Sequence, residues 1–552
     1  MQKEIEKQAK PWLYAALIFT ALYSALYLYK IFSNEFIVQD DARAHVFWAY
    51  KYLMPGYFNN DLMADYFESM APYGYKLFYQ YAALLNIPPF LLNKILPVIL
   101  GFATCYYAFR LANTLFSNPV VAFVSTLLLN HMLWGHDNLP SGTPRAFLYP
   151  LLLASLLFMM NKALWPLVLT FILEAFFYPH ALLISLATYS FTLIGFNQGY
   201  PYIRCTRGEF LSAIGVAGTA ALVLLPYIFK AHDFGPLVTI KEAVNLPEFQ
   251  KGGRSAFFSD SYWKYWISGS RSGMWPGSIE GITNICLILS LAFIFMGKRY
   301  SCLGLSESVS AKIGILYRLI FASLLLFFLA HLMLFHLHLP SRFTQHSFRI
   351  VTALLAAQIL VTSGRFFWDQ FKKGEISRGL KRGLTYASLT MYAYLLVYPL
   401  VLGIFGVNII DRGHYKVGKQ PQVYRFFSQL PSDSVVAALS DLSDNIPAFS
   451  LRSVVYSNEY AIAYHRGYYT KLVSRRNEME AAYLTDNADQ LREFIDKYRV
   501  SHVVIDEIAR QRWQLRQYEV QIPLLSKYAS QCRTFASEDV EVIDAKCVRQ
   551  FI

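Results

Sequence analysis

The sequence predicts a polytopic α-helical membrane protein with a small C-terminal α/β domain outside the membrane. The chain has 552 residues, of which 55% are hydrophobic and only 16% charged, whereas soluble domains carry about 25% charged residues. Apolar runs close to the roughly 20 residues needed to cross a bilayer recur throughout residues 1–409. After residue 410 the apolar runs become short and β-branched and alternate with helical segments, which is typical of an α/β fold.

Hydrophobic length predicts about eleven transmembrane helices in residues 1–409. The predicted spans cover about residues 11–32, 90–116, 119–135, 146–160, 163–179, 180–197, 209–230, 280–297, 313–337, 348–363 and 385–409. No small-residue cleavage site follows the first run, so we expect it to be a span and not a removable signal.

The distribution of basic residues predicts the orientation of these spans. Lys and Arg cluster in alternate loops, at Arg204 and Arg207, at Lys298 and Arg299, and in residues 365–383. The positive-inside rule then gives a cytoplasmic N-terminus, and an odd number of crossings places residues 410–552 on the extracytoplasmic side of the cell membrane. The formal net charge of +13 is explained by these loops, and we expect no binding of nucleic acid.

Three extracytoplasmic segments are large: the first loop at residues 33–89, a second loop at 231–279, and the domain at 410–552. The first loop ends in APYGYKLFYQYAALLNIPPF, which reads as an interfacial helix. Cys532 and Cys547 are the two cysteines in the C-terminal domain, so an oxidising compartment predicts a disulfide between them.

The first loop opens with the acidic pair of FIVQDDARAHVFW, residues 36–48. In a helix that starts here, Asp41, His45 and Trp48 share one face, which brings a carboxylate beside an imidazole and an aromatic surface that suits a sugar ring. The alternative is structural, because Asp is a favoured helix N-cap and an Asp–His pair four residues apart can be a surface pair. We expect Asp40 to cap the helix and Asp41 to be the functional residue.

Positive charge also occurs in two short outer loops that should avoid it. GHDNLPSGTPRAF contains Arg145, and HLPSRFTQHSFRI contains Arg342, His346 and Arg349. A single arginine at a helix end can extend to the membrane interface without a function. Together, these guanidinium groups are suited to bidentate binding of a phosphate group. Glu174 is the one clearly intramembrane acid, and its role stays open between a functional site and pairing with an outer arginine.

The acidic pair directly after the first span, the interfacial helix, the many spans and the C-terminal outer domain together resemble the GT-C superfamily of integral membrane glycosyltransferases. The stretches DSVVAALSDLSDNIPAFSLRSVVYSNEYA and LREFIDKYRVSHVVID are similar to the small α/β domains of several such enzymes. The resemblance implies that Asp41 or Asp40 is a general base and that the donor is a polyprenyl-phosphate-linked sugar at the membrane. In-line attack by an acceptor hydroxyl would then invert the anomeric carbon.

The resemblance leaves the acceptor open among glycan, lipid and protein, although the tryptophan-rich acidic motif of oligosaccharyltransferases is absent from the sequence. It also leaves open a divalent metal, Mg²⁺ or Mn²⁺, on Asp40 and Asp41. Two other classes compete with an enzyme. A transporter or flippase of lipid-linked sugars would use the same arginines but needs polar residues deep in the membrane. A non-catalytic membrane scaffold would leave the acidic pair without a role.

Overall fold

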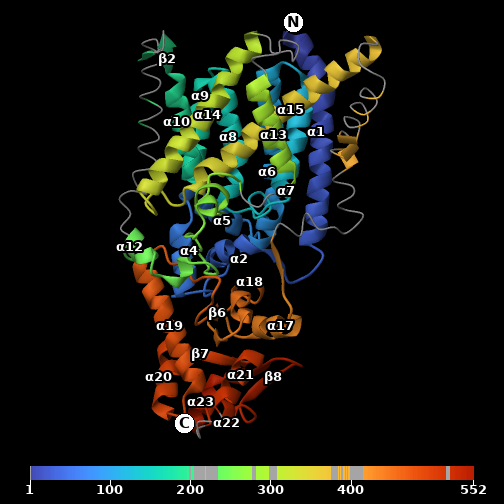
Figure 1. The fold of residues 1–552 in the computed structure, drawn as a ribbon. Helices are drawn as coiled ribbons and strands as arrows, with labels where there is room; N and C mark the ends of the chain where they lie inside the picture. Colours follow the sequence, from blue (N-terminus) through green and yellow to red (C-terminus); the bar gives the residue numbers. More distant parts are fainter. Residues whose placement is uncertain are drawn as a thin grey trace.

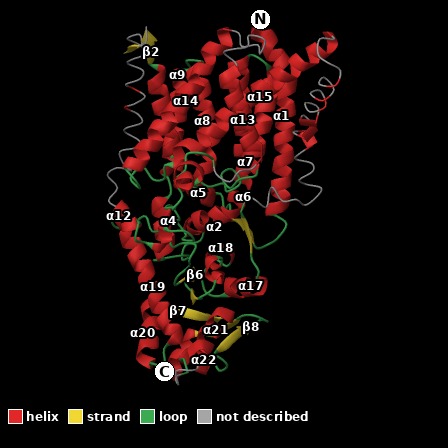
Figure 2. Cartoon of the chain, viewed as in Figure 1, coloured by secondary structure: helices red, strands yellow, loops and turns green. Residues whose placement is uncertain are grey.

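A computed structural model describes residues 2–197, 200–203, 234–276, 281–296, 307–373, 414–516 and 522–552, together with isolated positions in 215–218 and 379–397. The chain forms a helical bundle, a middle layer built from loops, and a separate domain at the far end (Figures 1 and 2). The N-terminus lies at the end of the bundle that is far from the C-terminal domain, and the C-terminus lies at the opposite end of the molecule (Figure 1).

The described helices of the bundle are α1 Gln2–Ile31, α6 Pro89–Phe116, α7 Pro119–Trp134, α8 Leu148–Met160, α9 Leu164–Phe177, α10 Pro179–Thr192, α13 Gly281–Met296, α14 Glu307–Leu332 and α15 Ser341–Lys373. Four helices in the described part of the chain, α1, α6, α14 and α15, are long and apolar enough to cross a membrane. Helix α7 packs against α1, α6 and α15. Every residue from Val121 to Trp134 is buried, as expected for a helix at the centre of a bundle.

Several predicted spans have different boundaries in the structure, for example the one at 313–337, which ends at Leu332. Two others, 209–230 and 385–409, fall almost entirely outside the described residues. The span predicted at 180–197 ends at Thr192, because Ile194–Asn197 (β2) pairs antiparallel with Tyr200–Ile203 (β3). The span predicted at 348–363 belongs to α15, which begins at Ser341. Hydropathy marks where a segment is apolar and not where its backbone hydrogen bonds begin, so these ends were misplaced.

The first loop, 33–89, forms most of the middle layer. Its elements are β1 Ile37–Gln39, α2 Asp40–Val46, the 3₁₀ helix η1 Phe47–Ala49, α3 Tyr50–Leu53, α4 Leu62–Met70 and α5 Tyr73–Leu84. Helix α5 occupies the predicted interfacial segment, packs against α9, and exposes Tyr73, Tyr81 and Leu84. An exposed apolar face of this kind suits a helix at the membrane interface.

The second loop joins the middle layer to the C-terminal domain. It contains α12 Ile240–Ala243, η3 Pro247–Phe249 and the π-helical η4 Lys264–Ser268. The Val238 amide donates to the Tyr464 carbonyl at 2.9 Å, and the Arg466 amide donates to the Pro236 carbonyl at 3.0 Å. The backbones of the loop and the domain are therefore directly bonded.

The C-terminal domain is built on a five-stranded mixed sheet with strand order β6-β5-β7-β9-β8. Its strands are β5 Val435–Ala437, β6 Ser453–Val454, β7 Val500–Ile505, β8 Arg533–Ala536 and β9 Glu541–Asp544, and its helices are α17 Pro421–Gln429, η7 Asp441–Asp444, α18 Ile446–Phe449, α19 Arg466–Leu484, α20 Ala488–Tyr498, α21 Glu507–Arg516, α22 Leu524–Tyr528 and α23 Ala545–Phe551. The β5 strand pairs parallel with β6 and β7, whereas β9 pairs antiparallel with β7 and β8. The predicted α/β fold is thus present.

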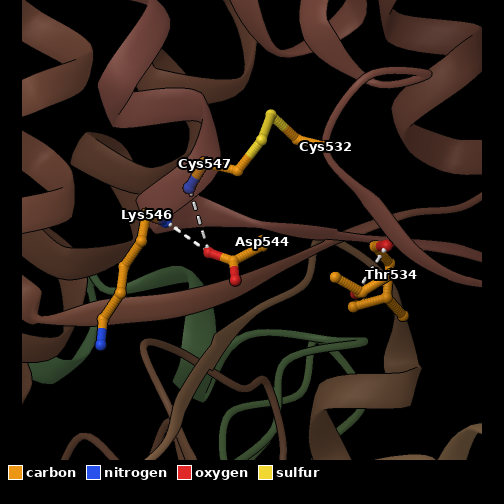
Figure 3. Close-up of a disulfide and its surroundings, with 6 residues drawn as sticks. Cys532, Thr534, Asp544, Lys546 and Cys547 are labelled. Atoms are coloured by element: carbon orange, nitrogen blue, oxygen red, sulfur yellow. Dashed lines mark hydrogen bonds between the residues drawn. A yellow bond between two sulfur atoms is a disulfide. The ribbon is translucent and has the colours of Figure 1, made fainter.

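A disulfide, a helix cap and a strand pairing complete this domain. The structure contains the predicted disulfide between Cys532 and Cys547, which joins the start of β8 to helix α23 (Figure 3). Asp544 caps α23 by accepting bonds from the Lys546 and Cys547 amides. At the other end, β4 Tyr415–Val417 pairs antiparallel with β1, so the domain begins as a strand bonded to the first loop directly before the acidic pair.

Candidate active site

Helix α2 begins at the acidic pair, but neither aspartate caps it. Gln39 is the N-cap residue, and its side-chain oxygen accepts a bond from the Ala42 amide at 3.1 Å. The expectation that Asp40 is the cap is therefore wrong. Gln39 is buried in the β1–β4 ladder, where its side chain already satisfies the orphan amide, and this leaves both carboxylates free for other contacts.

The two adjacent carboxylates contact different parts of the molecule. Asp40 faces the C-terminal domain, with its oxygens 2.7 Å from Arg43 Nη2 and 3.8 Å from Lys416 Nζ. Asp41 instead forms an ion pair with Nη2 of Arg145, in the segment between α7 and α8. Its side chain is 26% exposed, although Oδ2, the oxygen that contacts Arg145, is itself buried.

Arg145 lies in the 3₁₀ helix η2 Pro144–Phe147, directly before α8. Its Nη2 also contacts Asp137 Oδ2 at 3.4 Å, so the guanidinium lies between two carboxylates. Asp137 was not singled out in the sequence, although it stands in the same short outer loop as Arg145. The signal that could have found it is an acid and an arginine in one tight loop.

Arg342, His346 and Arg349 come together on one face of α15, because they are spaced four and three residues apart within the helix. Tyr149 of α8 joins this face to the segment that carries Arg145. Its hydroxyl lies 2.9 Å from His346 Nδ1 and accepts a bond from Arg349 Nη1 at 3.1 Å. Tyr149 thus links α8, which directly follows the segment with Arg145, to the helix that carries the other two arginines.

The charges in this cluster are not balanced. Within the part of the chain that the structure describes, the side chain of Arg342 forms no hydrogen bond and no ion pair, and that of Arg349 bonds a hydroxyl but no carboxylate. Burial and the like charge of Arg342 lower the pKa of Arg145. Repelling guanidinium groups held together by the fold are suited to bind an anion, since a bound anion relieves the repulsion.

His45 and Trp48 do not form the predicted face with Asp41. Trp48 is fully buried against Tyr52 and Tyr79, so it offers no surface to a sugar ring. The helix on which this prediction depended ends at Val46 and continues as η1, which changes the direction of residue 48. His45 packs edge-on against Phe67. Burial, with the nearby charges of Arg254 and Arg342, lowers the pKa of His45 to about 4, so its ring is neutral at neutral pH.

The carboxylates of the site do not fit a resident divalent metal. Among the described residues, no three His, Cys, Asp or Glu side chains come together to hold one. Asp40 and Asp41 face different partners, and the two carboxylates that approach each other, Asp41 and Asp137, have the cationic Arg145 between them. Positive charge at this position is supplied by the protein itself.

Glu174 lies outside this cluster. It is fully buried in the bundle, and its Oε1 accepts hydroxyl bonds from Ser155 and Ser185, each at 2.8 Å. These bonds join α8, α9 and α10, and the carboxyl group pairs with none of the arginines that the structure describes.

No protein-family model and no curated protein sequence matches this chain. The archaeal oligosaccharyltransferase AglB from Archaeoglobus fulgidus, solved in complex with an inhibitory peptide and a dolichol-phosphate, is similar in structure at a TM-score of 0.51 and 11% sequence identity, over 90% of this chain and 69% of AglB. ArnT from Cupriavidus metallidurans, solved with undecaprenyl phosphate bound, gives a TM-score of 0.46 and 11% identity, over 96% of this chain and 97% of ArnT. The likeness to AglB extends over the bundle and the C-terminal domain together. The chain therefore shares the fold of this archaeal structure over most of its length.

Proposed function

We propose that this protein transfers a sugar from a polyprenyl-phosphate-linked donor to a hydroxyl group of an envelope acceptor on the extracytoplasmic face of the membrane. The observation that carries the proposal is the contact of Asp41 with Arg145 at the edge of an unbalanced cluster of arginines. A proton acceptor and an anion site are therefore adjacent. The GT-C fold, shared with an enzyme solved with a dolichol-phosphate bound, supports a lipid-phosphate donor.

The arginine cluster is suited to the phosphate group of the donor. Arg342 and Arg349 project from the first turns of α15, at the end of the bundle next to the middle layer, where the headgroup of a membrane lipid would lie. A guanidinium group has five N–H donors in a planar fork, so it can bind two phosphate oxygens at once. In the transition state negative charge grows on the leaving phosphate, and fixed guanidinium groups stabilise it.

Asp41 is suited to accept the proton of the attacking hydroxyl. The acceptor oxygen forms a bond to the anomeric carbon while its proton passes to Asp41, and the bond from that carbon to the phosphate oxygen breaks with its electron pair on the polyprenyl phosphate. Attack from the face opposite the leaving group inverts the anomeric centre. The donor phosphate shares Arg145 with Asp41, and a second anion close to the carboxylate favours its protonation.

The test is release of lipid phosphate by the purified protein. We expect synthetic polyprenyl-phosphate sugars to be cleaved when hydroxyl-bearing envelope glycans, lipids or peptides are added, whereas nucleotide sugars should remain intact. A panel of sugars and acceptors identifies the substrates. If every lipid-linked sugar remains intact with every acceptor, the proposal is wrong.

A further inference from the structure

A second group of charged side chains lies between the C-terminal domain and the candidate active site, and the proposed reaction does not use it directly. Its centre is Glu459, which follows β6 in the C-terminal domain and is only 7% exposed. Glu459 Oε2 lies 2.7 Å from Arg43 Nη2, and Glu459 Oε1 forms an ion pair with Arg254. One buried carboxylate thus joins an arginine of the first loop to an arginine of the second.

Hydrogen bonds to the backbone of Glu459 hold this residue in place. Its amide donates to Asp444 Oδ1 at 3.0 Å, and its carbonyl accepts a bond from Arg254 Nε, also at 3.0 Å. The next residue, Tyr460, is fully buried. Its hydroxyl donates to the Arg43 carbonyl at 3.4 Å. Backbone and side-chain bonds therefore hold both arginines against one short segment of the domain.

Arg43 connects Glu459 to the acidic pair, because it lies on α2 two residues after Asp41. Besides Glu459, its guanidinium contacts Asp40 Oδ1 at 2.7 Å and Asn445 Oδ1 at 2.7 Å. The first turn of α2 is thus bonded to the C-terminal domain through a side chain that is itself buried.

Arg254 connects Glu459 to α15 through a chain of hydrogen bonds. Its carbonyl accepts a bond from Arg271 Nη2 at 2.9 Å, and the Arg271 carbonyl accepts one from the Ser341 amide at 3.3 Å. Ser341 is the first residue of α15 and directly precedes Arg342. A continuous chain of contacts therefore runs from α2 through Glu459 to the helix that carries the arginine cluster.

We propose that Glu459 is a positioning residue through which the C-terminal domain sets the distance between Asp41 and Arg342. This rests on the proposed function, in which Asp41 accepts the proton and Arg342 binds the phosphate. Loss of the negative charge leaves the buried guanidinium group of Arg43 and the partly exposed one of Arg254 to repel each other, and α2 and the second loop separate. A displacement of about 1 Å between reacting groups can reduce turnover by about a hundredfold.

The test is Glu459→Gln, which keeps the size of the side chain and removes its charge. We expect kcat to fall by about ten- to a hundredfold while the KM for the lipid donor changes less than about threefold, because the phosphate-binding side chains are unaltered. Asp489→Asn is the matched control. It removes an acid from an exposed ion pair with Arg492 in the same domain, so it should leave both constants unchanged.

Hydrogen exchange separates this proposal from the proposed function. In Glu459→Gln, amides of α2 and of the first turns of α15 should exchange faster, while those of α20 should not, whether or not the donor chosen is cleaved. If Glu459→Gln fails to fold, Arg254→Gln breaks the connection to α15 and leaves the pair of Glu459 with Arg43, and the same kcat loss and exchange at α15 are expected. Unchanged kcat and unchanged exchange in a folded variant would overturn the proposal, as would a rise in KM that accounts for the whole loss.

Discussion

The different surroundings of the two adjacent aspartates predict that their amide variants differ strongly in turnover. Asp41→Asn keeps the shape of the side chain and leaves Arg145 with its contact to Asp137 at 3.4 Å. Asparagine cannot accept a proton at neutral pH, so the variant should fold and bind the lipid donor but lose its general base. Asp40→Asn removes only the contacts with Arg43 and Lys416.

The expected magnitudes follow from these contacts. General-base catalysis contributes about 10²- to 10⁴-fold, so Asp41→Asn should reduce kcat at least about a hundredfold, or about 2.7 kcal/mol in the barrier. Asp40 is 28% exposed, and Arg43 keeps Glu459 and Asn445 as partners when Asp40 is replaced. A partly exposed pair of this kind contributes about 1 kcal/mol or less, so Asp40→Asn should cost less than about fivefold.

The assay is release of polyprenyl phosphate at saturating donor, with donor binding and thermal unfolding of both variants measured in the same detergent. Equal losses in the two variants would show that the helix start as a whole matters and not the base. A larger loss in Asp40→Asn would mean that the wrong aspartate has been assigned. Wild-type turnover in both variants and in the double variant would refute the enzymatic reasoning.

Four other predictions follow from the site and the C-terminal domain. Arg342→Lys keeps the charge but loses the bidentate fork, so the KM for the donor should rise at least about tenfold, and full activity in Arg342→Ala would remove this residue from the site. Cys532→Ser opens a disulfide with a sequence separation of 15 and should lower the unfolding free energy of the C-terminal domain by about 3 kcal/mol in denaturant titrations; an unchanged midpoint would contradict this. Burial lowers the pKa of His45 from 6.5 to about 4. Between these two pH values the folded protein binds fewer protons than the unfolded chain, so it loses stability as the pH falls. His45→Gln should reduce that loss of stability, by about 3 kcal/mol at most, when thermal unfolding is compared at pH 7 and pH 4.5. Because Arg145 lies between the carboxylates, chelators should leave turnover unchanged, and activity that disappears with EDTA and returns with Mg²⁺ or Mn²⁺ would contradict this expectation.

The sequence predicts those features that depend on local composition. Hydrophobic length places the core of α1, α6 and α14, and a change to short β-branched runs locates the α/β domain. The pairing of Cys532 with Cys547 follows from their shared compartment and not from their spacing. Arg342 and Arg349 are found because positive charge is unexpected in an outer loop.

The features that sequence alone does not give depend on contacts between distant segments. Asp40 contacts Lys416 of β4 and Arg43, and Arg43 in turn pairs with Glu459 of the C-terminal domain. Neither Lys416 nor Glu459 has a local signal in the sequence. Trp48 is misassigned because the 3₁₀ turn η1 interrupts the helical period on which the prediction depended. Helical spacing placed Asp41 correctly at the start of a helix but could not identify its partner, Arg145, more than a hundred residues away.

The central claim is that the protein cleaves the bond between sugar and lipid phosphate and does not only move the lipid. Sealed proteoliposomes that contain purified protein and a radiolabelled polyprenyl-phosphate sugar measure both events, with acceptor on one side of the bilayer. We predict that polyprenyl phosphate forms in a one-to-one ratio with an acceptor-linked sugar of inverted anomeric configuration, and that Asp41→Asn abolishes both products. Passage of the intact donor across the bilayer without release of lipid phosphate would contradict the account and favour a transporter.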